Sequence, residues 1–93
     1  MSTTVTPFSF VVDGERVTEG LLAVAKNLEG AGPEALLDFF FVQDIDQGGL
    51  RALEDLASAA EEKRIKVILR GVNVEIYKVM KLSRLTERYT FVN

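Results

Sequence analysis

LLDFFFVQDIDQGGL (residues 36–50) decides the fold, because it joins a strand, a polar loop and a helix start. The run Ala35–Val42 is apolar except for Asp38, which is typical of a strand buried in the middle of a sheet. We therefore expect the three phenylalanines, Phe39–Phe41, to lie in the core. A polar, glycine-bearing loop follows at residues 43–49, and such strand–turn–helix units commonly carry function in α/β proteins. After it, apolar residues recur at helical spacing: Leu50, Leu53, Leu56, Ala57 and Ala60.

The rest of the chain alternates strand and helix patterns. Strands are predicted at residues 8–12, 65–69 and 89–92, and helices at 16–29 and 49–63. Asn73 is a good N-cap for a third helix, which would bury Ile76, Val79 and Met80. The order β-α-β-α-β-α-β predicts an α/β fold. We expect one domain, residues 1–93, with a mixed four-stranded sheet and about three helices packed on it; residues 1–7 would form a flexible tail.

Composition excludes several classes of function. The chain has 93 residues, no cysteine and no histidine, so disulfides, thiolate metal sites and histidine general bases are impossible. No apolar run approaches the roughly 20 residues that span a bilayer, and the N-terminus lacks a signal-peptide pattern. We expect a cytoplasmic protein without direct membrane insertion, catalytic residues, metal or cofactor.

The net charge of −3 is unevenly distributed. Residues 63–93 hold eight of the eleven basic residues, whereas residues 1–62 hold twelve of the fourteen acids. The basic residues alternate with core-type positions, as in KVILR (66–70), and no aromatic residues interleave them as in a nucleic-acid groove. A solvated basic face is the better interpretation, and we expect no nucleic-acid partner.

The acidic loop admits several interpretations. Asp46 is placed to cap the second helix by accepting from the amides of Gly48 or Gly49. Asp38, Asp44 and Asp46 also resemble a magnesium cluster or a catalytic carboxylate pair. That interpretation is weaker, because Asp38 lies in a strand and no nucleophile or phosphate cradle accompanies it. Anion binding by the glycine amides is opposed by the adjacent carboxylates.

The same stretch resembles the signature of the STAS family, which includes anti-sigma-factor antagonists and the tails of sulfate transporters. Asp38 and Asp46 keep the family's spacing of eight residues, and Gly49-Leu50 keep its turn. GVNVEIYKVMKLSRL (71–85) is similar to the family's third helix and final apolar turn. The resemblance implies a domain that binds protein partners. In regulatory members a partner kinase phosphorylates a Ser or Thr just after the second Asp, but Gln47 and Gly48 replace those hydroxyls here.

Two kinds of partner follow from this resemblance. One is an anti-sigma factor or a related serine-kinase-like switch protein, bound without the usual phosphorylation. The other is the ATPase subunit of an ABC transporter for lipids, in the system that maintains outer-membrane lipid asymmetry; such a partner would attach the protein to the membrane. Off the apolar stripe of the second helix, Arg51, Glu54, Asp55 and Ser58 should face solvent. The predicted partner-binding residues are Asp44, Asp46, Gln47, Gly48, Gly49, Arg51, Glu54 and Asp55.

Overall fold

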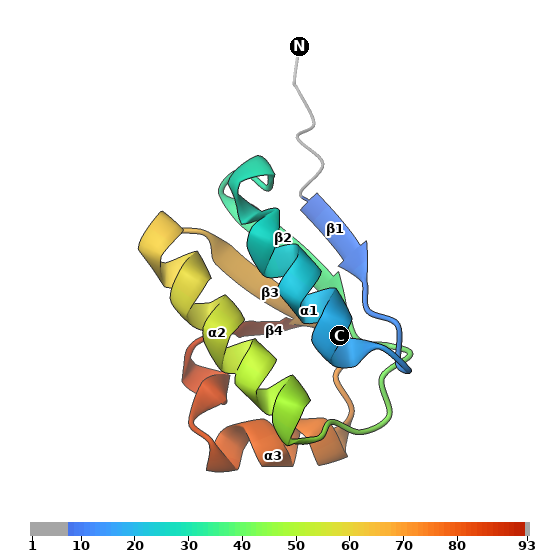
Figure 1. Ribbon diagram of the computed structural model, residues 1–93. Coiled ribbons are helices and arrows are strands. Elements are labelled where there is room, and N and C mark those ends of the chain that lie inside the picture. Colours follow the sequence, from blue (N-terminus) through green and yellow to red (C-terminus); the bar gives the residue numbers. More distant parts are fainter. Residues whose placement is uncertain (1–7, 93) are drawn as a thin grey trace.

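The computed structural model describes residues 8–92, and the predicted tail at 1–7 lies outside this part of the chain. Strands and helices alternate as the sequence predicts (Figure 1). The strands are β1 (Phe8–Val11), β2 (Glu34–Asp38), β3 (Lys66–Arg70) and β4 (Thr90–Val92). The helices are α1 (Val17–Lys26), α2 (Gln47–Lys63) and α3 (Val74–Leu82), with short 3₁₀ helices η1 (Leu28–Gly30) and η2 (Leu85–Glu87).

The strands form one sheet in the order β1-β2-β3-β4, and every neighbouring pair is parallel. The α/β prediction is confirmed, but the sheet is parallel throughout instead of mixed. A helix follows each of the first three strands and carries the chain back to the end from which the strand started. Each strand therefore enters the sheet in the same direction as the one before it.

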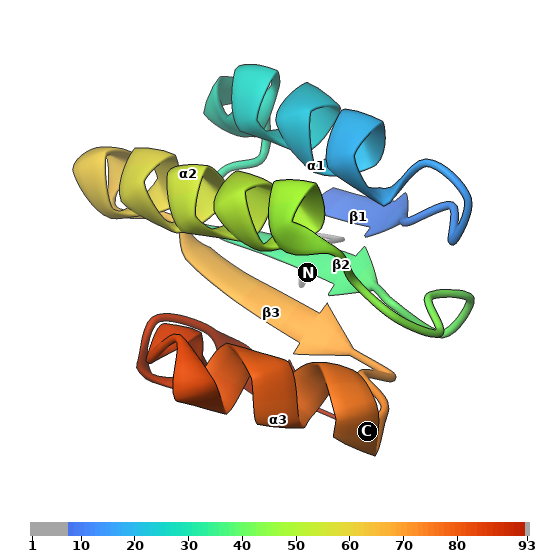
Figure 2. The same cartoon turned by 60° about the horizontal axis from the view of Figure 1, so that its bottom comes forward.

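The helices cover one face of this sheet. The ring of Phe10 lies 3.4 Å from where a Cβ on Gly20 of α1 would be. At the other edge, Tyr77 of α3 packs edge-on against Phe91 of β4, with ring centroids 5.2 Å apart. Phe10 and Phe91 belong to one register row, so their side chains share a face: Phe10, Leu37, Leu69 and Phe91. Figure 2 shows α1 and α2 side by side above the strands.

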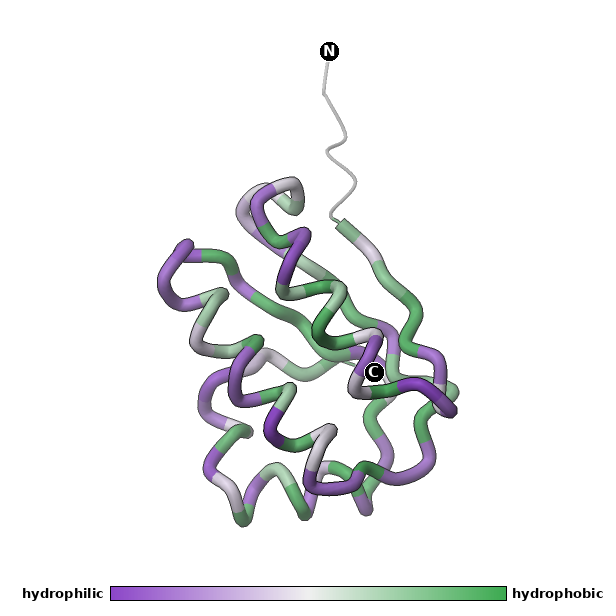
Figure 3. The backbone as a smooth tube through the Cα atoms, viewed as in Figure 1, coloured by the Kyte–Doolittle hydropathy of each residue, from purple (hydrophilic) through white to green (hydrophobic). Residues whose placement is uncertain are grey.

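Amphipathic helices supply most of the core. Along α2, hydrophobic positions recur between hydrophilic ones (Figure 3), and the predicted stripe is buried except for Leu50, which is half-buried. In α1, Leu21 and Val24 are buried, and Leu28 of η1 continues the stripe. Burial of these side chains against the sheet is the main favourable contribution to folding.

The prediction for the phenylalanine triplet was wrong for two of its members. Strand β2 ends at Asp38 and does not continue to Val42. Phe39 is fully buried, whereas Phe40 is 73% exposed and Phe41 is 62% exposed. The Asp38 side chain accepts a hydrogen bond from the Phe40 amide, and the Val42 amide donates to the Phe39 carbonyl oxygen. These two bonds close a turn, which takes the place of strand pairing and directs two of the three rings outward.

Helix boundaries differ from the prediction by small amounts. The first helix ends at Lys26 instead of Glu29, because the chain tightens into η1. The second helix starts at Gln47, two residues earlier than expected, directly after its N-cap Asp46. Within residues 8–92, no helix combines the length and apolar character needed to cross a membrane.

Candidate functional site

Asp46 fixes the start of α2. Its backbone is extended, and its Oδ1 accepts a hydrogen bond of 2.8 Å from the amide of Gly49. The carbonyl oxygen of Asp46 also accepts the first helical bond, from the amide of Leu50 at 2.9 Å. The sequence predicted this cap, because an acidic side chain satisfies amides that the first helical turn leaves without partners.

Asn73 ties the loop before α2 to the start of α3. Its Oδ1 accepts from the amide of Ile76 at 2.9 Å, which is the predicted N-cap. Its Nδ2 donates to the carbonyl oxygens of Val42 at 3.3 Å and Gln43 at 2.9 Å. The second role is not visible in the sequence, because it joins groups about thirty residues apart along the chain. Asn73 therefore positions the 43–46 loop, and with it the first turn of α2.

The exposed face of α2 forms one side of an open depression of about 410 Å³. Gln47, Gly48, Arg51 and Glu54 line it together with the half-buried Leu50, and Ser83 at the end of α3 completes it. We call this the α2 depression. All four residues predicted to leave the apolar stripe are exposed: Arg51, Glu54, Asp55 and Ser58. The structure thus brings four of the eight predicted partner-binding residues together around one hollow.

The other four predicted residues lie elsewhere. Asp44 and Asp46 line a separate hollow of about 250 Å³ beside the loop and first turn of α1. Gly49 is buried, and a Cβ there would come within 2.5 Å of Ile45 Cγ1, so this glycine serves packing. Asp55 is exposed but does not line the α2 depression.

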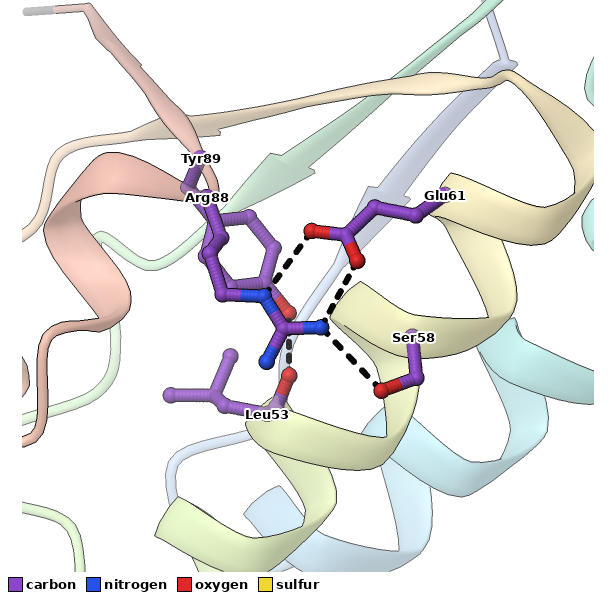
Figure 4. Close-up of polar contacts among 5 residues, drawn as sticks. All are labelled: Leu53, Ser58, Glu61, Arg88 and Tyr89. Atoms are coloured by element: carbon purple, nitrogen blue, oxygen red, sulfur yellow. Dashed lines mark hydrogen bonds and ion pairs between the residues drawn. The ribbon is translucent and has the colours of Figure 1, made fainter.

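The later turns of α2 hold the C-terminal segment in place (Figure 4). Arg88 donates to both carboxylate oxygens of Glu61, from Nε at 2.8 Å and Nη2 at 2.9 Å, and to Ser58 Oγ at 3.1 Å. The hydrogen bonds from Arg88 lower the pKa of Glu61. The Tyr89 hydroxyl donates to the Leu53 carbonyl oxygen at 2.6 Å, and burial raises the pKa of Tyr89. These contacts are structural, and they engage the Ser58 hydroxyl.

The alternative of a metal cluster finds no support in the geometry. Within residues 8–92, no three carboxylates gather in an arrangement that could hold a metal ion. Oδ1 of Asp38 accepts the amide of Phe40, and Oδ1 of Asp46 accepts the amide of Gly49. Two of the three suspected ligands thus have local capping roles.

Two exposed apolar features near the site were missed at the sequence level. Phe40 and Phe41 project from the turn after β2, and Leu82 at the end of α3 is 87% exposed. Asp38 was an available signal for the exposed phenylalanine pair, since aspartate favours turns and capping over strand interiors. No comparable signal marks Leu82, which continues an apolar helix pattern.

Comparison with known proteins supports the family that the motif and fold indicate. The model of the STAS domain matches residues 19–92. The chain belongs to the STAS domain family. In general, STAS domains are non-catalytic domains that regulate or mediate protein–protein interactions. No curated protein matches the sequence significantly.

Solved STAS structures share the fold at low sequence identity. A putative anti-sigma factor antagonist from Thermotoga maritima is 15% identical, with a TM-score of 0.71 over 90% of this chain and 73% of that one. The STAS domain of a SulP transporter from Vibrio cholerae is also 15% identical, with a TM-score of 0.75 over 98% of this chain and 77% of that one. At this identity the likeness concerns the fold alone.

Proposed function

We propose that this STAS protein is a non-enzymatic cytoplasmic interaction domain that binds a switch kinase or anti-sigma-type partner through the α2 depression. The observation that carries the proposal is the grouping of Gln47, Gly48, Arg51 and Glu54 around one open hollow at the capped start of α2. A polar rim around a small apolar contact, here Leu50, suits a transient protein partner.

Binding through this surface would be constitutive, that is, not switched off by phosphorylation of the first turn of α2. Gln47 and Gly48 are both exposed at the first positions of α2, where regulated family members carry hydroxyls. Neither residue has a hydroxyl that a kinase could phosphorylate, and neutral Gln47 does not mimic the charge of phosphoserine. A cognate kinase should therefore leave positions 47 and 48 of wild type unmodified and add one phosphate at position 47 of Gln47→Ser, as measured by intact mass and peptide mapping. Phosphate on another residue together with loss of binding would show that a different switch operates.

Gly48→Glu tests the surface directly. A Cβ at position 48 would meet its nearest neighbours, Thr18 Oγ1 and Asp46 Oδ1, at 3.4 and 3.5 Å, which are ordinary contacts, so the fold should persist. The added charged side chain would stand at the edge of the α2 depression, near Thr18 and Asp46, and would obstruct the approach of a partner. In affinity purification from native cells, we expect wild type to retain the kinase-like or anti-sigma partner and Gly48→Glu to lose it.

Gly30→Glu is the matched control. Nothing lies within 4 Å of a Cβ at this position, and Gly30 ends η1 at the opposite end of the molecule from the start of α2 (Figure 1). It makes the same chemical change and should bind as wild type does. Arg51→Glu should weaken binding, and more so at low salt, because the reversed charge is solvent-exposed. Full binding by a folded Gly48→Glu variant would rule out this surface.

A second candidate is a permanent subunit that packs on the ATPase subunit of a lipid ABC transporter. The observation that favours it is Leu82, 87% exposed and adjacent to Ser83 of the α2 depression. Interfaces of permanent complexes are more apolar at their centres than those of transient ones. If this function holds, the captured partner will be a transporter ATPase, will survive high-salt washing and will be lost with Leu82→Glu. If the switch-protein function holds, salt will weaken the complex.

A further inference from the structure

The turn after β2 holds its two outward-facing phenylalanines in a fixed backbone. The Phe39 amide donates to the Arg70 carbonyl oxygen at 2.7 Å, which anchors the turn to the end of β3. Asp38 Oδ1 accepts from the Phe40 amide at 2.9 Å, and the Val42 amide donates to the Phe39 carbonyl oxygen at 2.9 Å. Together, the three bonds hold the amides of Phe39, Phe40 and Val42 between β2 and the polar loop.

Two glycines, Gly14 and Gly71, lie against the backbone of this turn. A Cβ on Gly14 would overlap the carbonyl oxygen of Phe41, and a Cβ on Gly71 would lie 3.3 Å from the N and Cα atoms of Phe40. The loop after β1 and the loop after β3 thus approach the backbone as closely as residues without side chains allow. Three hydrogen bonds and two close approaches by glycine therefore hold the backbone that carries the aromatic pair.

The two rings form an exposed apolar patch together with Val11. Phe40 and Phe41 make an edge-to-face pair with centroids 5.4 Å apart. Val11, at the end of β1, is 54% exposed and lines the same hollow as Phe41. Single exposed apolar side chains are normal on protein surfaces, but contiguous ones on a fixed support mark contact sites.

Carboxylates surround the hollow beside Phe41, which we call the Phe41 cleft. It has a volume of about 610 Å³ and no lysine or arginine in its lining. Its acidic residues are Asp13, Glu15 and Asp44, all exposed, and none takes part in the ion pairs found within residues 8–92. The remaining lining residues are Val11, Val12, Gly14, Phe41 and Gln43.

We propose that the Phe41 cleft binds a segment of a partner protein that carries a large apolar side chain flanked by lysine or arginine. The apolar side chain would pack on Phe41 and Val11, and the basic residues would meet the carboxylates around them. Charge complementarity decides between occupants, because anionic lipid headgroups and nucleic-acid phosphates would be repelled by this rim. A second copy docking by the same face would bring its own acidic rim against the first.

The Phe41 cleft is separate from the α2 depression and does not rest on the function proposed there. The lining residues of the two hollows do not overlap. The cleft would therefore give the domain a second contact, either with another partner or with a basic extension of the same one.

The test is selection of a random library of twelve-residue peptides on the purified protein. We expect enrichment of peptides with leucine, phenylalanine or tryptophan next to lysine or arginine. Their binding, measured by fluorescence polarisation, should weaken at least about tenfold with Phe41→Ser, as for an aromatic contact at the centre of an interface. Leu22→Ser is the matched control, since Leu22 is also an exposed apolar residue, lies on α1 and is absent from the cleft lining.

The rim is tested with neutral variants. Glu15→Gln and Asp44→Asn should each weaken the selected peptides by about two- to fivefold at low salt, and less at high salt. Glu62→Gln, which changes an exposed carboxylate near the end of α2, should have no effect. Far-ultraviolet circular dichroism of each variant confirms the fold before binding is compared.

Four outcomes would overturn the proposal. The first is enrichment of peptides without basic residues, and the second is equal binding by folded Phe41→Ser. The third is sedimentation of the protein with phosphatidylglycerol vesicles in a Phe41-dependent manner, which would assign the patch to a membrane. The fourth is a concentration-dependent dimer that Phe41→Ser abolishes, which would assign it to a second copy of the chain.

Discussion

The three consecutive phenylalanines offer a sharp test of the fold, because the structure assigns them different environments. Phe39 has no exposed surface, whereas Phe40 is 73% and Phe41 62% exposed. A buried phenylalanine removes roughly 150–250 Å² from water, which at about 25 cal/mol per Å² corresponds to about 4–6 kcal/mol as an upper estimate. We therefore expect Phe39→Ala to lower the free energy of unfolding by about 3–5 kcal/mol. Phe40→Ala should change it by no more than about 0.5 kcal/mol.

Urea unfolding followed by circular dichroism measures the change in the free energy of unfolding for both variants, and thermal unfolding measures the change in Tm. At roughly 4–8 °C per kcal/mol for a domain of this size, Phe39→Ala should lower Tm by about 12–40 °C. Because small domains are stable by only about 5–15 kcal/mol, Phe39→Leu serves as a milder substitution, with an expected loss of about 1–2 kcal/mol. Comparable destabilisation by Phe40→Ala and Phe39→Ala would refute the turn and restore a strand through all three residues.

Three further predictions concern polar contacts. Tyr89→Phe removes the hydroxyl that donates to the Leu53 carbonyl oxygen and should lower the free energy of unfolding by about 1–2 kcal/mol in urea; an unchanged midpoint would contradict its anchoring role. The lowered pKa of Glu61 beside Arg88 means that the carboxylate stabilises the fold at neutral pH, and that this contribution is lost as the pH falls below the ordinary value of 4.5. On acidification from about pH 6 to about pH 3, wild type should therefore lose more stability than Glu61→Gln, and equal losses would argue against the linkage. Asn73→Ala removes the helix cap and both loop bonds and should cost about 1–2 kcal/mol of unfolding free energy. Asn73→Ser loses the loop bonds but keeps a cap acceptor and should cost less; an equal cost for the two variants would mean that the cap contributes little.

Local features of this protein could be predicted from the sequence because they depend on neighbouring residues. The helical stripe through Leu53 and Leu56 follows from a period of about 3.6 residues, and the structure buries both side chains. The caps at Asp46 and Asn73 each act on an amide three residues ahead. The order of strands and helices has the same origin, since it follows from successive local patterns.

The site could be predicted only in part. Gln47, Gly48, Arg51 and Glu54 come together because they are neighbours on one exposed helix face, and helical periodicity places them there. Ser83 joins them only through the packing of the end of α3 beside α2, which nothing near it in the sequence encodes.

Tertiary structure decided most of the environment of Phe40 and Phe41, although Asp38 gives a local signal for the turn. An apolar run has the same composition whether it continues a strand or enters a turn. Hydrophobicity therefore does not show whether a given side chain points into the core or into solvent. The turn forms where the Asp38 side chain captures the Phe40 amide and where Gly14 and Gly71, distant in the sequence, close on the backbone. The double role of Asn73 and the Arg88–Glu61 pair likewise join residues about thirty positions apart. Such contacts are fixed only when the packed sheet and helices bring those residues within bonding distance, which is why the sequence determined the elements and the tertiary structure decided which of their side chains face solvent.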